Sequence, residues 1–458
     1  MDSVFQTIHF IVWGPWTLFI FIGVGIWFSV RSGLFQIRGI KMWLGETAGA
    51  VLRAETDQEK GRSKGGITAF QSACTALAAT IGTGNIVGVA TALTAGGPGA
   101  LFWMWMSALI GMMTAYTETA LGQQYRIRGA DGSWICGPMI YMERGLHSPV
   151  MGILYAVLAL FSSLGMGSMV QANSISGTLT FGTGIPAWVI GAAVTAAVAA
   201  VVVGGAVRIA RVSERMMPLS AGIYILFSLA VILSCYEILP AVFGRIFREA
   251  FQFRSISGGA AGFVMNRSIR YGLSRGVFSN EAGLGSLAVL HGAAEETTPQ
   301  KQGMWAIFEV FFDTIVVCTM TALVILCITY YTGMPDQYDG AALTAWCFSR
   351  RLGRLGEALV SGAMVAFAFA TIVAWYYLGR QTAGYLLHKL LPGERSEKAG
   401  LHIYTLLYLA AVFVGCIGRM DAVWIFSDIW NGLMAYPNLL ALVLLAGQVS
   451  YPKKNQTG

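Results

Sequence analysis

Two long stretches without any charged side chain constrain the fold of this chain more than any other feature. The 53 residues from Gly65 to Thr117 contain no Asp, Glu, Lys or Arg, and neither do the 63 residues from Gly145 to Val207. A membrane-spanning helix needs about 20 apolar residues, so each stretch can hold two such helices joined by a tight turn. Only 12% of the 458 residues are charged, against roughly 25% in soluble proteins. We therefore expect an all-α polytopic protein embedded in a lipid bilayer.

Hydrophobic patterning divides the chain into eleven predicted transmembrane helices. They are expected at 8–30, 68–95, 99–121, 150–178, 187–205, 217–238, 259–292, 302–332, 356–379, 400–417 and 421–448. The predicted organisation is an extra N-terminal helix within 1–30, a cytoplasmic loop at 31–67, five helices at 68–238, five more at 259–448 and a cytoplasmic tail at 449–458.

The basic residues predict the orientation of the chain. The side that includes the loop 31–67 carries 20 of the 30 Lys and Arg residues. The positive-inside rule places that side in the cytoplasm, with the N-terminus outside and the C-terminus inside. The net charge of +7 is thus explained by topology, and we expect no nucleic-acid partner. The seven cysteines lack C-x-x-C spacing, which argues against a zinc site or a disulfide framework.

The second predicted span is interrupted by T-I-G-T-G-N-I-V-G at Thr80–Gly88. A glycine inside a helix costs about 1 kcal/mol relative to alanine, and backbone groups freed within a membrane must find other partners. Close helix packing at small residues is the alternative explanation, but these glycines flank the polar Thr83 and Asn85. A nucleotide-binding loop is excluded, because no acidic residue follows about 20 positions later. We predict a broken helix.

Span seven carries a second interruption, in R-Y-G-L-S-R-G-V-F-S-N-E-A-G-L-G-S-L at Arg270–Leu287. We expect this break near Phe278, with Ser279 or Asn280 capping the half-helix that follows and Glu281 at its N-terminus. The two breaks are 195 residues apart, and each opens a group of five helices. This pattern is typical of inverted-repeat secondary transporters, whose broken helices form a site at the membrane midplane. A surface loop between two short helices is the alternative.

The backbone of the first break offers ligands for both signs of charge. The N–H groups of about Thr83 to Ile86, where the outer half-helix starts, can bind a carboxylate. The carbonyls of about Ala78 to Gly82, including that of Ile81, end the inner half-helix and can coordinate a cation. An amino acid together with sodium fits this arrangement better than a sugar or a nucleobase.

Three motifs in order resemble the sodium:alanine symporter family, also called the alanine or glycine:cation symporter family. They are Thr80–Gly88, G-G-P-G-A-L-F-W-M-W at Gly96–Trp105, and S-R-G-V-F-S-N-E-A-G-L-G at Ser274–Gly285. The likeness extends over nearly the whole chain. It implies a leucine-transporter-like 5+5 inverted repeat with one extra N-terminal helix. It also implies sodium- or proton-coupled uptake of a small neutral amino acid, alanine or glycine, through the bacterial plasma membrane.

The resemblance also implies which residues form the site. The substrate-binding residues it implies are Thr83, Gly84, Asn85, Gln171, Phe278, Ser279, Asn280 and Trp375. Thr371 would supply an oxygen to the sodium ion, beside the expected carbonyl ligands at Ala78 and Ile81. Thr371 and Trp375 are four residues apart and share a helix face.

Several of these residues have structural alternatives. Gln171 is equally suited to an interhelical hydrogen bond, and Trp375 to packing. An ionised Asp313 near the midplane of span eight costs roughly 2.5–3.5 kcal/mol, so it needs a pairing partner or a role in ion coupling. Glu118 is expected to pair with or orient another group. The five histidines fall near span ends or in loops, which gives little support for a proton relay.

Three classes of function remain to be compared. The first is a sodium-driven symporter of alanine or glycine, with no cofactor besides the coupling ion. The second keeps the fold but carries another cargo, such as glutamine, or couples to protons through Asp313. The third is a channel or a sensor. An enzyme is disfavoured, because no nucleophile–base pair or metal cluster is visible in the sequence.

Overall fold

A computed structural model describes residues 7–8, 11–50, 66–129, 134–251, 267–295, 297–391 and 393–452. Its elements up to the middle of the chain are α2 (Pro15–Arg31), α3 (Phe35–Arg38), α4 (Ile40–Glu46), α6 (Ala69–Thr80), the 3-10 helix η1 (Thr83–Asn85), α7 (Val87–Gly96), α8 (Ala100–Tyr125), strands β1 (Ile127–Arg128) and β2 (Trp134–Ile135), α9 (Pro138–Gly145), α10 (Pro149–Leu164), the π-helix η2 (Gly165–Met169), α11 (Val170–Thr183), α12 (Ala187–Val202) and α13 (Gly205–Leu233).

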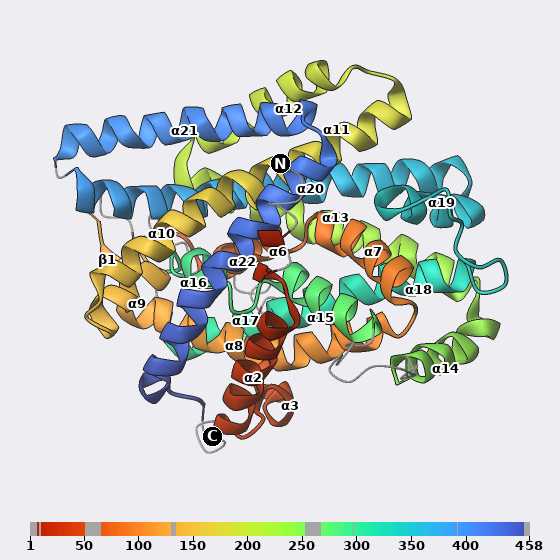
Figure 1. Cartoon of the computed structure of the whole chain (residues 1–458), viewed down its shortest axis with the longest axis horizontal. Coiled ribbons are helices and arrows are strands. Elements are labelled where there is room, and N and C mark those ends of the chain that lie inside the picture. Colours follow the sequence, from red (N-terminus) through yellow and green to blue (C-terminus); the bar gives the residue numbers. More distant parts are fainter. Residues whose placement is uncertain are drawn as a thin grey trace.

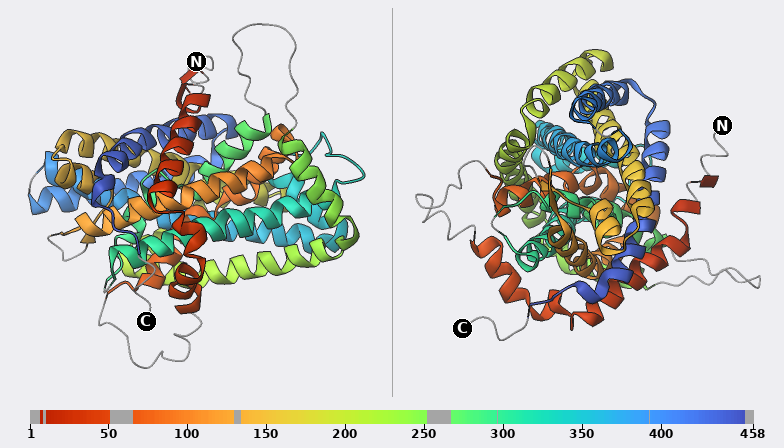
Figure 2. Two further views of the ribbon diagram at one scale, coloured as in Figure 1. Left: turned by 90° about the horizontal axis from the view of Figure 1, so that it is seen from below. Right: turned by 90° about the vertical axis from the view of Figure 1, so that its left-hand side faces the viewer.

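The remaining elements are η3 (Tyr236–Ile238), α14 (Leu239–Ala250), α15 (Arg267–Asn280), α16 (Ser286–His291), α17 (Pro299–Val310), the π-helix η4 (Phe311–Cys318), α18 (Thr319–Ile328), α19 (Gly340–Leu352), α20 (Arg354–Leu390), α21 (Glu394–Ile417), α22 (Met420–Leu445) and η5 (Ala446–Gln448). The long helices α8, α20 and α21 run along the long axis of the molecule (Figure 1). The N-terminal segment α2–α4 runs across one side of this bundle (Figure 2).

The helical membrane architecture predicted from the sequence is confirmed. Among the described residues, seven continuous helices are long and apolar enough to cross a membrane, and the bent pair formed by α6 and η1–α7 makes an eighth. The helices α2 and α12 are apolar but shorter, with 17 and 16 residues. The count of eleven spans and the inverted repeat stay predictions, and the expected start of span seven at 259–266 lies outside the described residues.

The predicted break in span two is present. The helix α6 begins with a capping box, in which Thr68 Oγ1 accepts a hydrogen bond from the Gln71 amide and Gln71 Oε1 accepts one from the Thr68 amide, both at 3.1 Å. The helix ends at Thr80, directly before the glycine-rich stretch, and the chain resumes as η1 and α7. The two halves are bent by 56°.

The break in span seven lies later than the sequence predicted. The helix α15 continues through Phe278, Ser279 and Asn280, and the interruption covers 281–285. The prediction that Ser279 or Asn280 caps the next half-helix, with Glu281 at its N-terminus, was therefore wrong; Gly285 is the residue that directly precedes α16.

Two glycines and one distant carboxylate explain this position. Gly283 and Gly285 adopt φ angles of 92° and 85°, which glycine tolerates because it has no Cβ. Their amides donate hydrogen bonds of 3.2 and 3.1 Å to Oε2 of Glu118 on α8. Glu118 therefore satisfies the backbone that the break exposes, as the expected orienting role requires.

Both broken helices lie in the packed interior. The helix α8 packs against α15, α16 and α17, while α20 packs against α6, α11 and α13. The break residues 81–86 and 281–285 are buried. These contacts surround the two breaks with polar side chains from other helices.

Candidate functional site

Two side chains predicted as site residues contact the backbone on the two sides of the break in span two. Gln171 lies on α11, and its Oε1 accepts a hydrogen bond of 3.2 Å from the amide of Thr83. Thr371 lies on α20, and its Oγ1 donates a hydrogen bond of 2.8 Å to the carbonyl of Ala78. A Cβ at Gly82 would stand 2.7 Å from Thr371 Oγ1 and 3.1 Å from Gln171 Oε1. The missing side chain at position 82 is what lets these two groups approach the backbone.

The end of α15 forms a wall opposite the same break. A Cβ at Gly84 would lie 3.5 Å from Phe278 Cδ1 and 3.5 Å from the Cα of Ser279, so these two predicted residues do face the break. The side chain of Asn280 points away from the first break. Its Oδ1 accepts a hydrogen bond of 3.2 Å from the amide of Ala282, and its Nδ2 donates one of 3.4 Å to Thr314 Oγ1. The structure therefore places Asn280 against its own break and span eight.

Asp313 joins the two broken helices. Its Oδ1 accepts a hydrogen bond of 2.6 Å from Nδ2 of Asn85, and its Oδ2 accepts bonds of 2.8 Å from Ser279 and Thr314. The side chain is fully buried and lies in the π-helix η4, a type of irregularity that frequently occurs at functional sites. The predicted need of Asp313 for partners is confirmed, and these partners are neutral donors.

The interior around the breaks is rich in acidic side chains. Glu118, Glu281, Glu309 and Asp313 are at most 1% exposed, whereas no lysine or arginine in the described part of the chain is buried. Ionised carboxylates in a low-dielectric interior are costly unless another charge or a proton compensates them. The site therefore favours a cation.

Trp375 on α20 is fully buried, and it packs against η2, where a Cβ at Gly167 would lie only 2.4 Å from the Cβ of Trp375. Its Nε1 interacts with the carboxylate of Glu281, whereas Thr83 Oγ1 is buried and has no hydrogen-bond partner among the described residues. Most buried polar atoms have a partner, so the Thr83 hydroxyl is available to a ligand. The predicted function of Trp375 as the pocket cap stays a prediction.

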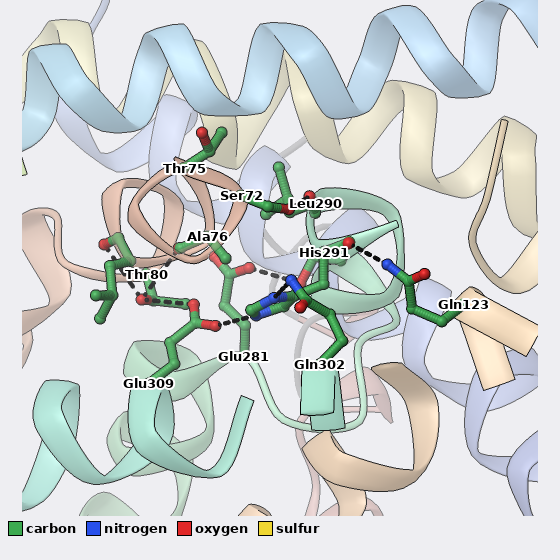
Figure 3. Close-up of polar contacts among 12 residues, drawn as sticks. Ser72, Thr75, Ala76, Thr80, Gln123, Glu281, Leu290, His291, Gln302 and Glu309 are labelled. Carbon is green, nitrogen blue, oxygen red and sulfur yellow. Dashed lines mark hydrogen bonds and ion pairs between the residues drawn. The ribbon is translucent and has the colours of Figure 1, made fainter. Parts of the chain in front are cut away.

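Two buried residues were missed from the sequence. Glu309 lies four residues before Asp313, a spacing in an apolar span that places both carboxylates on one helix face. His291, expected near a span end, is the last residue of α16 but is fully buried, with Nε2 2.8 Å from Oε2 of Glu309 (Figure 3). The spacing of the two acids was a usable signal, whereas the burial of His291 depends on packing.

A buried interrupted helix, lined by polar groups from several neighbouring helices of a membrane bundle, is the architecture of a secondary transporter. Within this class, the chain belongs to the Sodium:alanine symporter family, whose profile matches residues 1–455. It is therefore a transporter and not an enzyme.

Named relatives cover almost the full chain. The Sodium/alanine symporter AgcS of Methanococcus maripaludis is 38% identical, over 98% of this chain and 95% of that protein. The Probable sodium/glutamine symporter GlnT of Bacillus subtilis is 34% identical, over 98% of this chain and 89% of that protein. An uncharacterized transporter of Haemophilus influenzae is 39% identical, over 97% and 93% respectively.

Two solved structures share the fold at low sequence identity. MhsT in complex with L-phenylalanine matches with a TM-score of 0.58 and 14% identity, over 84% of this chain and 90% of that one. A substrate-bound Na+-coupled sialic acid symporter matches with a TM-score of 0.57 and 12% identity, over 98% and 99%. These likenesses confirm the leucine-transporter-like fold class that the motifs implied.

Proposed function

We propose that the protein is a secondary active symporter, which couples sodium entry to the uptake of alanine or glycine through the bacterial plasma membrane by alternating access. The observation that carries this proposal is the convergence of Gln171, Thr371 and Asp313, from three other helices, on the break in span two. The names of relatives such as the sodium/alanine symporter support the choice of cargo and ion.

The carboxylate of the amino acid binds at the start of the outer half-helix. The amides of Gly84 and Asn85 lie in the first turn of η1, where helix amides lack intrahelical acceptors, and the helix dipole favours an anion there. Thr83 Oγ1 is the nearby unpartnered hydroxyl. Phe278 and Trp375 limit the volume left for the side chain of the substrate, which favours alanine or glycine over larger amino acids.

Sodium binds on the inner side of the break. The carbonyls of Ala78 and Ile81, together with Thr371 Oγ1, supply neutral oxygen ligands, which hard cations prefer. Asp313 supplies negative charge next to Asn85 and completes the coupling between the cation and the substrate site. One sodium is sufficient: a charge crossing 100 mV gives about 2.3 kcal/mol and a tenfold gradient about 1.4 kcal/mol, which together sustain an accumulation of about 500-fold.

Uptake into proteoliposomes tests this proposal. Radiolabelled L-alanine should accumulate under an inward sodium gradient, with saturation, and unlabelled glycine and alanine should compete more strongly than glutamine. The panel includes both D- and L-alanine and is repeated under a proton gradient without sodium. Stronger competition by glutamine, or uptake driven by protons alone, would favour the alternative symporter of the same fold. Alanine flux that ignores both gradients would reject symport and leave a channel.

A further inference from the structure

A second buried polar centre, formed by Thr80, His291, Gln302 and Glu309 (Figure 3), includes a carboxylate four residues before Asp313. Glu309 stands between two helices there: its Oε1 is 3.2 Å from Thr80 Oγ1, and its Oε2 is 2.8 Å from His291 Nε2. On the other side of the imidazole, Gln302 Nε2 lies 3.1 Å from His291 Nδ1. The side chains of His291 and Glu309 are 0% and 1% exposed.

The partners of His291 define its protonation. The amide nitrogen of Gln302 faces the ring, with Gln302 Oε1 accepting from Thr297 Oγ1 at 3.3 Å, and in this arrangement the amide donates to Nδ1. A ring whose Nδ1 accepts is neutral and carries its proton on Nε2. His291 therefore donates to Oε2 of Glu309, which leaves the pair one proton short of neutrality.

The surroundings do not supply the missing positive charge. The buried ionisable groups around Glu309 are Asp313 on the same span, Glu281 at the break in span seven, Cys74 on α6, and Tyr116 and Glu118 on α8. The exposed Lys301–Glu46 pair lies at the start of α17. The buried members of this set are all acids. A buried net negative charge of this kind is costly in the membrane interior.

A proton fits this centre better than a metal ion. Thr80 Oγ1 is the one oxygen that hydrogen-bonds to Glu309 among the described residues, and its other carboxylate oxygen faces the His291 imidazole, whereas hard cations take about six or more oxygen ligands. An added proton also has an acceptor ready. A proton on Oε1 can be donated to Thr80 Oγ1, whose own hydrogen then goes to the carbonyl of Ala76 or Leu77, each 3.3 Å away. The hydrogen bond between His291 Nε2 and Glu309 Oε2 is retained in this step.

We propose that Glu309 is a proton-binding site, separate from the substrate and sodium sites, with His291 as its positioning residue. In the binding step a proton forms one O–H bond at Oε1, the direction of the Thr80–Glu309 hydrogen bond reverses, and the charge of the centre rises from −1 to 0. The chain Thr297–Gln302–His291 leads from the loop to Glu309. Since Thr80 ends the inner half-helix α6, the proton state acts on the element that bounds the sodium site.

Infrared difference spectroscopy tests proton binding without transport. The purified full-length protein in liposomes, without substrate, should show a carboxylic acid C=O band that appears as the pH is lowered. Glu309→Gln, which imitates the protonated acid, should lose this band, and the exposed control Glu394→Gln should keep it. An unchanged band in Glu309→Gln overturns the proposal. If Glu309→Gln does not fold, His291→Leu provides the test. Loss of the hydrogen bond from His291 destabilises the ionised carboxylate, so the midpoint pH at which the band appears should rise. An unchanged midpoint overturns the proposal.

A transport readout rests on the proposed function and is kept separate. With a fixed sodium gradient and a fixed outer pH, alanine uptake by the unmodified protein should change about threefold or more between internal pH of about 6 and about 8. Alanine uptake by Glu309→Gln should not depend on internal pH, and its rate should equal that of the unmodified protein at acid pH. The same pH profile in both proteins overturns the proton site. Absence of alanine uptake at every pH overturns the proposed function instead, while the infrared result still decides on the proton site.

Discussion

At the scale of single residues, substitution of Thr371 tests the proposed sodium site most directly. Its hydroxyl touches the carbonyl of Ala78, and both oxygens are proposed ligands. Thr371→Ala removes one ligand and should raise the sodium concentration for half-maximal uptake about tenfold, equivalent to about 1.4 kcal/mol. Thr371→Ser retains the oxygen and should respond to sodium like the unmodified protein. Sodium titrations of alanine uptake compare the three proteins, and an unchanged titration for Thr371→Ala would remove Thr371 from the site.

Glu118 stabilises the backbone of the break in span seven. Its Oε2 accepts hydrogen bonds from the amides of Gly283 and Gly285 and from Nδ2 of Asn438. Glu118→Ala leaves the two buried glycine amides without this acceptor and should lower the free energy of unfolding by about 1–3 kcal/mol for each, while Asn438 Nδ2 keeps its bond to the carbonyl of Gly283. The exposed Glu394→Ala should leave it essentially unchanged, because Glu394 lies on the surface. Unfolding in detergent micelles measures both, and equal stability of the two variants would contradict the role given to Glu118.

At the scale of elements, the two broken helices differ in how far the sequence determines them. The first break depends on local chemistry, since three glycines fall within nine residues of an uncharged stretch at Thr80–Gly88. The second break depends on Glu118, which lies 165 residues before Gly283. The cap-forming residues Ser279 and Asn280 suggested an earlier break because local propensity cannot reveal a distant acceptor. Phe278 and Ser279 lie beside Gly84 of the first break, and their role in substrate binding stays a prediction.

The geometry of the first break predicts a strong effect of one methyl group. Gly82→Ala would place a Cβ 2.7 Å from Thr371 Oγ1 and 3.1 Å from Gln171 Oε1, so these side chains must shift away from the backbone. We expect at least about a tenfold loss of uptake, because displacement of such polar groups costs about 1–3 kcal/mol, with the protein still folded. Gly88→Ala is the matched control, since no atom lies within 4 Å of its Cβ. Equal uptake by the two variants would show that the inner side of the break is not the binding region.

For the whole molecule, composition was sufficient to predict a helical membrane protein, and the three motifs were sufficient to imply its fold class. Long-range pairings were beyond the sequence. The ring of His291 contacts Glu309 and Gln302, and only the packing of α16 against its neighbours turns a histidine near a span end into a buried one. The position of His291 near a span end gave no sign of this burial, because position along a span does not determine burial.

Orientation in the membrane is the property of the whole molecule that the charge pattern predicts most directly. Because 20 of 30 basic residues lie on one side, the loop 380–399 should be cytoplasmic and the end of span eight extracellular. Tyr331 is 80% exposed at that end, and the side chain of Glu394 is 78% exposed in the loop. The seven native cysteines are buried, so they give little background labelling. A membrane-impermeant maleimide should label Tyr331→Cys in intact cells, and Glu394→Cys only after permeabilisation. The reverse pattern would invert the topology, place the loop 293–301 outside, and require the proton of Glu309 to enter from the extracellular side.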